Sequence, residues 1–249
     1  MLQNSILLHE YDSVIEGKSM QYIVMLILTM MLWGCDGGSV LGPESMRTKF
    51  PTIGSVFYYE GYEIDRFDSR IPGTTREFTS VVMSADTILF GKSDVYVIRT
   101  QYPDTSFIEY FAINDEFDIL RRMTLGSSSV WVTVPITSLA ETNDTIKTTI
   151  DLAPGKRGTL EYMYKHTYFG DQSFALDTVQ VSGRKFRSTL KYQVVSSGQI
   201  SNAGVDESID HYLPSLGMLA HSIMHARYDE RTGKWVNGYV IRLKKHTSQ

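Results

Sequence analysis

Two histidines four residues apart, His221 and His225 in the stretch HSIMH, have the spacing of a metal-binding pair. On an α-helix, side chains at positions i and i+4 lie about 5–6 Å apart, close enough to share a zinc ion. On a β-strand, at about 3.4 Å per residue, the same spacing separates them by about 13–14 Å. The hairpin signal that follows them favours a strand. We therefore expect two ordinary surface histidines and no metal site.

Other catalytic motifs are incomplete. The residues GKS at 91–93 are similar to the end of a phosphate-binding loop, but Asp86 stands where that motif requires its first glycine. The chain has no Gly-x-Ser-x-Gly motif, and LGSSSV at 125–130 is expected to be a polar loop rather than a nucleophile turn. The sequence therefore predicts no cofactor and no enzymatic activity; the alternative is a hydrolase whose residues meet only in the folded protein.

Acidic residues gather at two places without the spacing of a calcium loop. One group contains Asp115, Glu116 and Asp118, and the other contains Asp206, Glu207 and Asp210. We interpret both as solvated charges in turns. His166 lies on the tyrosine-rich face of an expected strand, and we expect it to be a hydrogen-bonded histidine at the rim of a barrel.

The only cysteine, Cys35, follows an uncharged apolar run from Tyr22 to Trp33. At about 1.5 Å per residue this run spans about 18 Å, less than the roughly 30 Å of hydrocarbon in a bilayer. It has the size of the apolar core of a secretory signal peptide, with Lys18 as the preceding positive charge. The alternative is a buried core helix with an ordinary thiol. Because a leftover thiol is a liability in an oxidising compartment, we favour a role that uses the sulfur.

The residues LWGC at 32–35 resemble the lipobox of bacterial lipoproteins, in which a small residue precedes a cysteine that is diacylated and becomes the mature N-terminus. The resemblance implies cleavage between Gly34 and Cys35 and a lipid on Cys35. Trp33 departs from the pattern, which favours a small residue there. Two or three acyl chains, at about 0.8 kcal/mol per buried CH₂, hold a protein firmly on a membrane. The expected location is the bacterial cell envelope, anchored and facing the periplasm or the cell surface.

The expected organisation has three parts. Residues 1–34 form a signal peptide, with Met20 as an alternative start that would leave 1–19 outside the protein. Residues 35–50 form a lipidated tether rich in glycine, proline and serine. Residues 51–249 form a single β domain, for which a hydrophobic content of 42% is ample. The net charge of −4 argues against nucleic acid as a partner, which would need a basic surface.

The body of the chain alternates apolar and polar residues with the period of two that is typical of half-buried β-strands. The clearest segments are 159–169 and 186–196. The other expected strands lie at 55–64, 74–84, 94–101, 106–114, 130–135, 145–152, 174–182, 218–228 and 235–243. Turns are expected at Ile71-Pro72-Gly73, Tyr102-Pro103-Asp104, Ala153-Pro154-Gly155-Lys156, Phe169-Gly170-Asp171 and Arg231-Thr232-Gly233-Lys234. This pattern predicts an all-β fold, an antiparallel meander of long strands curled into an open barrel or sandwich.

A second resemblance begins at HYLPSLGMLAHS, residues 211–222. Pro214 has no N–H to donate and should end the preceding strand, and Gly217 can take a positive φ and reverse the chain. With GSVFYYEGYE at 54–63 and VSGRKFRSTLKYQVV at 181–195, this pattern resembles a group of uncharacterised envelope proteins with a curled β-meander. The fold of that group is similar to that of the lipoprotein-localisation carriers, which implies an apolar cavity under the sheet and a hydrophobic ligand.

Three functions follow as hypotheses. The first is a non-enzymatic envelope lipoprotein that binds a hydrophobic ligand or a protein partner. The second is a structural or assembly subunit of an envelope complex, and the third is a hydrolase. The strand tyrosines, most simply core residues, could instead line a groove for an apolar or glycan ligand. An internal cavity would favour the first, and a filled core with an exposed apolar patch would favour the second. Convergent carboxylates or histidines in a cleft would favour the third.

Overall fold

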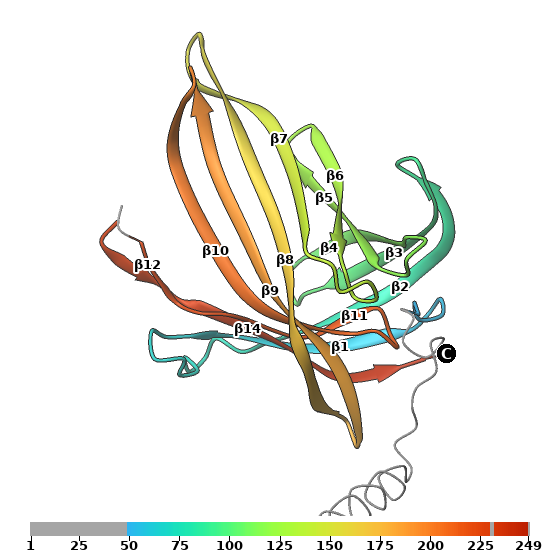
Figure 1. Cartoon of the computed structure of the whole chain (residues 1–249). Coiled ribbons are helices and arrows are strands. Elements are labelled where there is room, and N and C mark those ends of the chain that lie inside the picture. Colours follow the sequence, from blue (N-terminus) through green and yellow to red (C-terminus); the bar gives the residue numbers. More distant parts are fainter. Residues whose placement is uncertain (1–48, 230–231, 249) are drawn as a thin grey trace, which may run out of the picture. The chain divides into compact units, whose positions relative to one another are not determined.

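The computed structural model describes residues 49–229 and 232–248. This part of the chain forms β-strands and contains no helix (Figure 1). This confirms the expected all-β class. The strands are β1 (Val56–Ile64), β2 (Arg76–Leu89), β3 (Lys92–Gln101), β4 (Ser106–Ile113), β5 (Ile119–Leu125), β6 (Ser128–Val134), β7 (Thr142–Ala153), β8 (Lys156–Leu176), β9 (Val179–Ser196), β10 (Gln199–Leu213), β11 (Met218–Met224), β12 (Arg227–Asp229), β13 (Lys234–Val236) and β14 (Gly238–Thr247).

Twelve of these strands form one antiparallel sheet in the order β6-β5-β4-β3-β2-β1-β14-β11-β10-β9-β8-β7. Two meanders, β1–β6 and β7–β11, are joined where β14 pairs with both β1 and β11. The hairpin β12–β13 forms a separate two-stranded sheet. The large sheet curls until its two edge strands, β6 and β7, approach each other (Figure 1). The predicted curled meander is therefore confirmed as a nearly closed barrel.

Side chains bridge the seam between β6 and β7, which are not paired with each other in the sheet. The backbone N–H of Thr133 donates to Asp144 Oδ2 at 2.8 Å, and the Thr142 hydroxyl donates to the Thr133 carbonyl at 3.0 Å. The connecting segment is fixed by Asp118, which is 1% exposed and accepts the backbone N–H groups of Thr137 and Ser138 at 2.6 and 3.0 Å. The expectation that Asp118 is a solvated turn charge is wrong, because its carboxylate holds the loop that brings the edges together.

The two largest clusters of buried residues lie on the inner face of the curled sheet. Phe57, Ile98 and Leu213 centre one cluster, and Ile119, Ile136 and Phe186 belong to a second. Phe50 packs against both clusters and stacks on Tyr96 at 4.3 Å between ring centroids. Since Lys49 also donates its backbone N–H to the Pro214 carbonyl, the ordered body includes residues 49 and 50, before the expected boundary at 51.

Several expected turns and strand ends are confirmed. Gly73, Gly155 and Gly217 adopt positive φ, and β10 ends at Leu213, immediately before Pro214. Residues 169–171, however, are not a turn: they continue β8 through an irregularity in its pairing with β9, where Gly170 has φ 117°. The segment 174–182 is likewise not one strand, because it contains the turn between β8 and β9.

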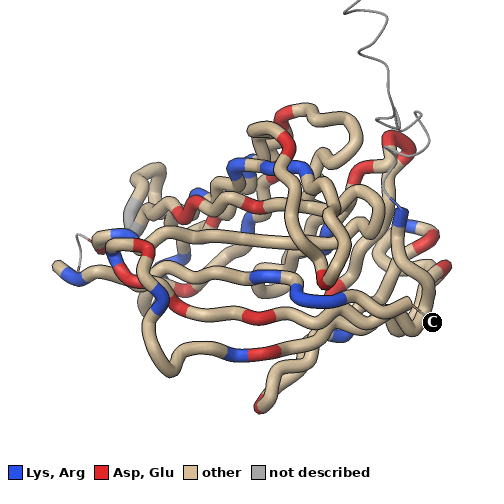
Figure 2. The backbone as a smooth tube through the Cα atoms, turned by 90° about the horizontal axis from the view of Figure 1, so that it is seen from below, with Lys and Arg blue, Asp and Glu red and all other residues tan. Residues whose placement is uncertain are grey.

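Two strands, β5 and β10, had no counterpart among the sequence-predicted strands. Both place charged residues on the inner face, Arg121 on β5 and Asp210 on β10, so the usual apolar row is interrupted. On the described strands basic and acidic positions are interspersed rather than gathered by sign (Figure 2).

Candidate functional site

A cavity with two adjoining lobes lies inside the curled sheet. Each lobe has a volume of about 310 Å³, in the range of small-molecule sites. The first lobe is lined mainly from β1–β5, β10 and β11, and the second mainly from β5, β6 and β8–β11. The two lobes share a set of lining residues: Arg121, Val134, Ser208, Asp210, Tyr212, Ser222 and Ile241. Because the shared residues include charged ones, the cavity has a polar centre between largely apolar ends.

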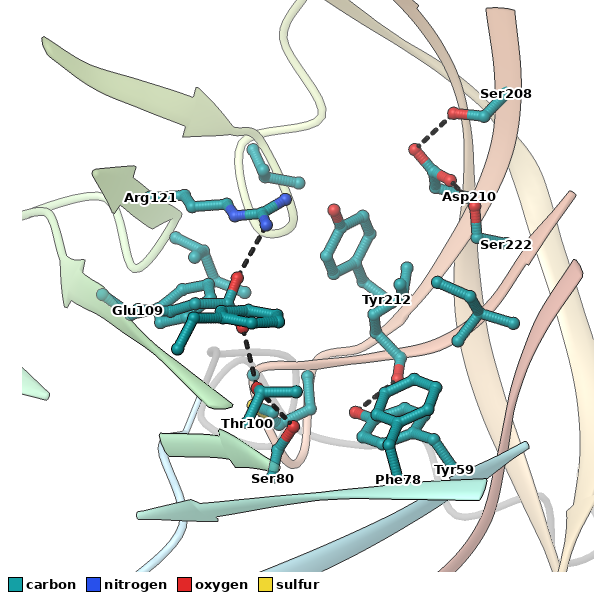
Figure 3. A pocket seen from close by; sticks show the side chains of 18 of the residues that line it. Tyr59, Phe78, Ser80, Thr100, Glu109, Arg121, Ser208, Asp210, Tyr212 and Ser222 are labelled. Carbon is teal, nitrogen blue, oxygen red and sulfur yellow. Dashed lines mark hydrogen bonds and ion pairs between the residues drawn. The ribbon is translucent and has the colours of Figure 1, made fainter. Parts of the chain in front are cut away.

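One wall carries a chain of polar side chains that crosses four strands (Figure 3). Arg121 Nη2 donates to Glu109 Oε1 at 2.6 Å, and the Thr100 hydroxyl donates to Glu109 Oε2 at 3.0 Å. Thr100 is bonded in turn to Ser80 at 2.8 Å, and Ser80 must be the donor because the Thr100 proton points to Glu109. The Arg121 side chain is 43% exposed, and it faces the cavity rather than being covered by protein. Partial removal from water lowers the pKa of this guanidinium, but the combined opposing effect of Glu109, Tyr212 and Asp210 is larger, so the pKa is raised and the group stays charged.

The opposite wall presents the carboxylate of Asp210 (Figure 3). Ser222 donates to Asp210 Oδ1 at 2.5 Å, and Ser208 donates to Oδ2 at 3.0 Å. Asp210 is 7% exposed, so the expectation that it is a solvated turn charge is wrong. The period of two along β10 turns Asp206, Ser208 and Asp210 inward together.

Tyrosines lie next to these charges. Burial, followed by the Asp210 charge, raises the pKa of the Tyr212 phenol. Burial and Glu109 likewise raise the pKa of Tyr59, whose hydroxyl donates to the Leu219 carbonyl at 3.0 Å. Both phenols are therefore neutral hydrogen-bonding groups at neutral pH.

A ladder of stacked rings lines the first lobe. Tyr59, Phe78, Tyr102 and Phe107 follow one another across β1, β2, the end of β3 and β4, with ring centroids 5.0, 4.5 and 5.7 Å apart. All four side chains contribute to the lining. The ladder gives the lobe a flat, rigid apolar surface at low cost in side-chain entropy.

The second lobe contains a histidine–serine pair. His166 on β8 and Ser188 on β9 are cross-strand partners, and His166 Nδ1 lies 2.9 Å from the Ser188 hydroxyl. His166 is 8% exposed, and burial lowers its pKa, so the ring is neutral at neutral pH. The sequence places His166 correctly on the tyrosine-rich face, because Tyr164 lines the same lobe. It did not identify Ser188 as its partner.

The two histidines with the spacing of a metal-binding pair, His221 and His225, lie at two different places. His221 lies on β11 opposite His211 of β10, with ring centroids 5.4 Å apart. His225 lies beyond the end of β11, where its Nδ1 is 2.8 Å from Asp68 Oδ1. The described part of the chain holds no group of three or more His, Cys, Asp or Glu side chains placed to share a metal ion.

The remaining motifs are turns or lie outside the described residues. Gly91 adopts φ 74° between β2 and β3, and Gly126 adopts φ 58° between β5 and β6, so GKS and LGSSSV both lie at hairpin turns. The predicted cleavage and lipidation residues, Gly34 and Cys35, lie outside the described residues, as does the tether up to residue 48. Within 49–229 and 232–248, no helix has the length and hydrophobicity needed to cross a membrane.

No family model matches the sequence, and no curated protein matches it significantly. Among solved structures, the chain is similar to a Parabacteroides distasonis protein provisionally described as a lipoprotein, with TM-score 0.51, 11% identity, and coverage of 81% of this chain and 99% of that one. It also aligns with a Bacteroides fragilis protein provisionally described as exported and as having a YmcC-like fold, with TM-score 0.42, 9% identity, and coverage of 81% and 100%. At 11% identity the first similarity defines the class of fold, a curled all-β sheet, and no ligand.

Proposed function

We propose that this protein is a non-enzymatic lipoprotein of the bacterial cell envelope that holds a small, partly apolar molecule inside its barrel. The observation that carries the proposal is the two-lobed cavity, with aromatic and aliphatic walls around a polar centre. Concave sites of this size with a few polar groups are typical of small-molecule binding.

The envelope location is supported by the lipobox-like sequence at 32–35 and by the apolar run that precedes it. The provisional description of the Parabacteroides distasonis protein as a lipoprotein agrees with this location. Lipidation of Cys35 would anchor the protein to a membrane of the envelope, with the cavity-bearing body facing the periplasm or the cell surface.

Native mass spectrometry of the purified protein tests ligand binding. The form starting at Asp36 is suitable, because all twelve strands of the sheet lie between residues 56 and 247. We expect an added mass of small-molecule size that disappears in Ser222→Phe, since a bulky ring there fills the junction of the lobes. Ser173→Phe, an exposed serine on β8, is the matched control and should keep the ligand. A wild-type spectrum without any added mass, both for protein purified from membranes and for protein purified from the cytoplasm, would contradict the proposal.

A hydrolase is less well supported than a binding protein. Ser188 and His166 are bonded, but among the described residues none donates to or accepts from the other ring nitrogen of His166. A catalytic serine needs a base that is held by a third group and an oxyanion site. A fluorophosphonate probe should therefore leave Ser188 unlabelled, and stoichiometric labelling that Ser188→Ala abolishes would favour the hydrolase.

One surface feature favours the assembly-subunit alternative. The hairpin β12–β13 stands outside the main sheet and exposes Tyr228, Trp235 and Val236 by 52, 49 and 41%. Exposed aromatic residues are typical of protein interfaces. Photo-crosslinking from position 235 in cells would yield a specific partner if this alternative holds, and background only if it does not.

A further inference from the structure

Two unlike polar groups face each other where the two lobes of the cavity meet. Arg121 on β5 points inward from one wall, and Asp210 on β10 points inward from the other (Figure 3). They do not form an ion pair with each other; the Arg121 ion pair is with Glu109. The space between them belongs to both lobes, so a molecule in either lobe can place one end there.

Each of the two groups retains hydrogen-bonding capacity. A guanidinium has five N–H donors, and among the described residues Arg121 uses one nitrogen, Nη2, on Glu109. A carboxylate has about four acceptor positions, and Asp210 receives one hydrogen bond at each oxygen, from Ser222 and Ser208. The junction therefore offers donors on one side and acceptors on the other.

The charges of the junction disfavour an ionic ligand group. An anion near Arg121 would also meet the carboxylates of Glu109 and Asp210, and a cation near Asp210 would meet the Arg121 guanidinium. Burying a charge is costly unless it is paired and fully hydrogen-bonded. A neutral group that both accepts and donates uses both walls without this cost.

We infer that the ligand of this cavity carries a neutral amide or hydroxyl group that accepts a hydrogen bond from Arg121 and donates one to Asp210, with an apolar portion extending into a lobe. The inference rests on the proposed function, since it needs an occupant in the cavity. The apolar portion would lie against residues such as Met123, Leu190 and Met224 in the second lobe or against the aromatic ladder in the first.

Three eight-carbon probes separate the possibilities by their polar ends. Octanamide donates and accepts, octanoate only accepts, and octylammonium only donates at pH 7. Titrated calorimetrically into ligand-free protein starting at Asp36, octanamide should bind at least tenfold more tightly than either ion. Asp210→Asn should weaken octanamide at least fivefold and strengthen octanoate, because one repelling charge is removed. Glu161→Gln, on the outer face of β8 and paired with Lys147, should leave all three unchanged.

The possible results separate the inference from the proposed function. Equal binding of the three probes would keep the cavity as a binding site but overturn the assignment of the junction. Tightest binding of octylammonium would also overturn it and would mean that Asp210 alone binds the polar end of the ligand. Tightest binding of octanoate would overturn it too and would mean that Arg121 alone does so. Binding of no probe, together with a ligand-free native mass spectrum, would overturn the proposed function itself. Because the probe comparison uses wild-type protein, it remains decisive even if Asp210→Asn folds poorly.

Discussion

At the scale of the residue, the buried polar groups determine how the protein responds to its surroundings. His211 is 2% exposed, bonds to Gln172 Oε1 through Nε2 at 2.9 Å, and has His221 and Lys185 nearby. Burial, then His221 and Lys185, lowers the pKa of His211 to about 4, against the opposing effect of Asp210. The ring is therefore neutral in the folded protein under conditions where the unfolded chain is already protonated.

This pKa shift predicts acid sensitivity. The unfolded state binds a proton at His211 near pH 6.5 and the folded state only near pH 4, so stability is full above pH 6.5 and falls as the pH drops towards 4. The loss from this one residue should be at most about 3 kcal/mol. Urea unfolding at pH 7.5 and 5.0 measures it: His211→Gln should lose less stability between the two than the wild type. The exposed His225→Gln is the control, and an unchanged pH dependence in His211→Gln would refute the assignment.

At the scale of the element, the seam between β6 and β7 is expected to be the least stable part of the barrel wall. Neighbouring strands elsewhere in the sheet share a backbone ladder, whereas these two edges are joined by side-chain bonds at Thr133, Thr142 and Asp144. Regions with few backbone bonds to neighbours open at lower free energy than core strands. The seam is therefore the part of the wall through which the interior is most easily reached.

Asp144→Ala should loosen this seam. Losing its bond to the Thr133 N–H should cost about 1 kcal/mol, the usual net contribution of one hydrogen bond. Hydrogen exchange followed by mass spectrometry should show faster exchange in β6 and β7, with β8 and β9 unchanged. Asp151→Ala, at the exposed end of β7, is the matched control. Exchange that rises uniformly over the sheet would mean that Asp144 supports the whole fold rather than the seam.

At the scale of the whole molecule, the first and the last strand of the described chain are neighbours in the sheet. β1 and β14 are paired along their length, and Phe50 packs on the core just before β1. The described body is therefore packed onto its core from Phe50 onward.

Lipidation of Cys35 is the prediction at this scale. Palmitate labelling in cells should mark the wild type and not Cys35→Ser, because a hydroxyl cannot replace the thiol that is acylated. The variant should persist as an uncleaved precursor, since its apolar run of about 18 Å spans a bilayer poorly. Equal labelling of both, or of neither when a control lipoprotein labels in the same cells, would contradict lipidation, and Trp33 would be the first residue to vary.

The sequence by itself determined the class of fold, because apolar residues that alternate with polar ones indicate strands with one face buried and the other in water. It placed β1, β8 and β9 in outline and put His166 on the tyrosine-rich face. It could not place β5 and β10, because their inward positions include Arg121 and Asp210. The polar centre of the cavity accommodates charged side chains at inward positions, so these two strands lack the apolar alternation by which the others were predicted.

Only the tertiary structure decided which distant residues meet. Arg121 and Glu109 are 12 positions apart, but Tyr59 and Leu219 are separated by 160, and they meet because β14 pairs with both β1 and β11. Pairing between strands so far apart in the sequence depends on the topology of the whole sheet, and local periodicity carries no information about it. The polar centre of the cavity forms because the sheet curls and brings β5 and β10 to opposite walls.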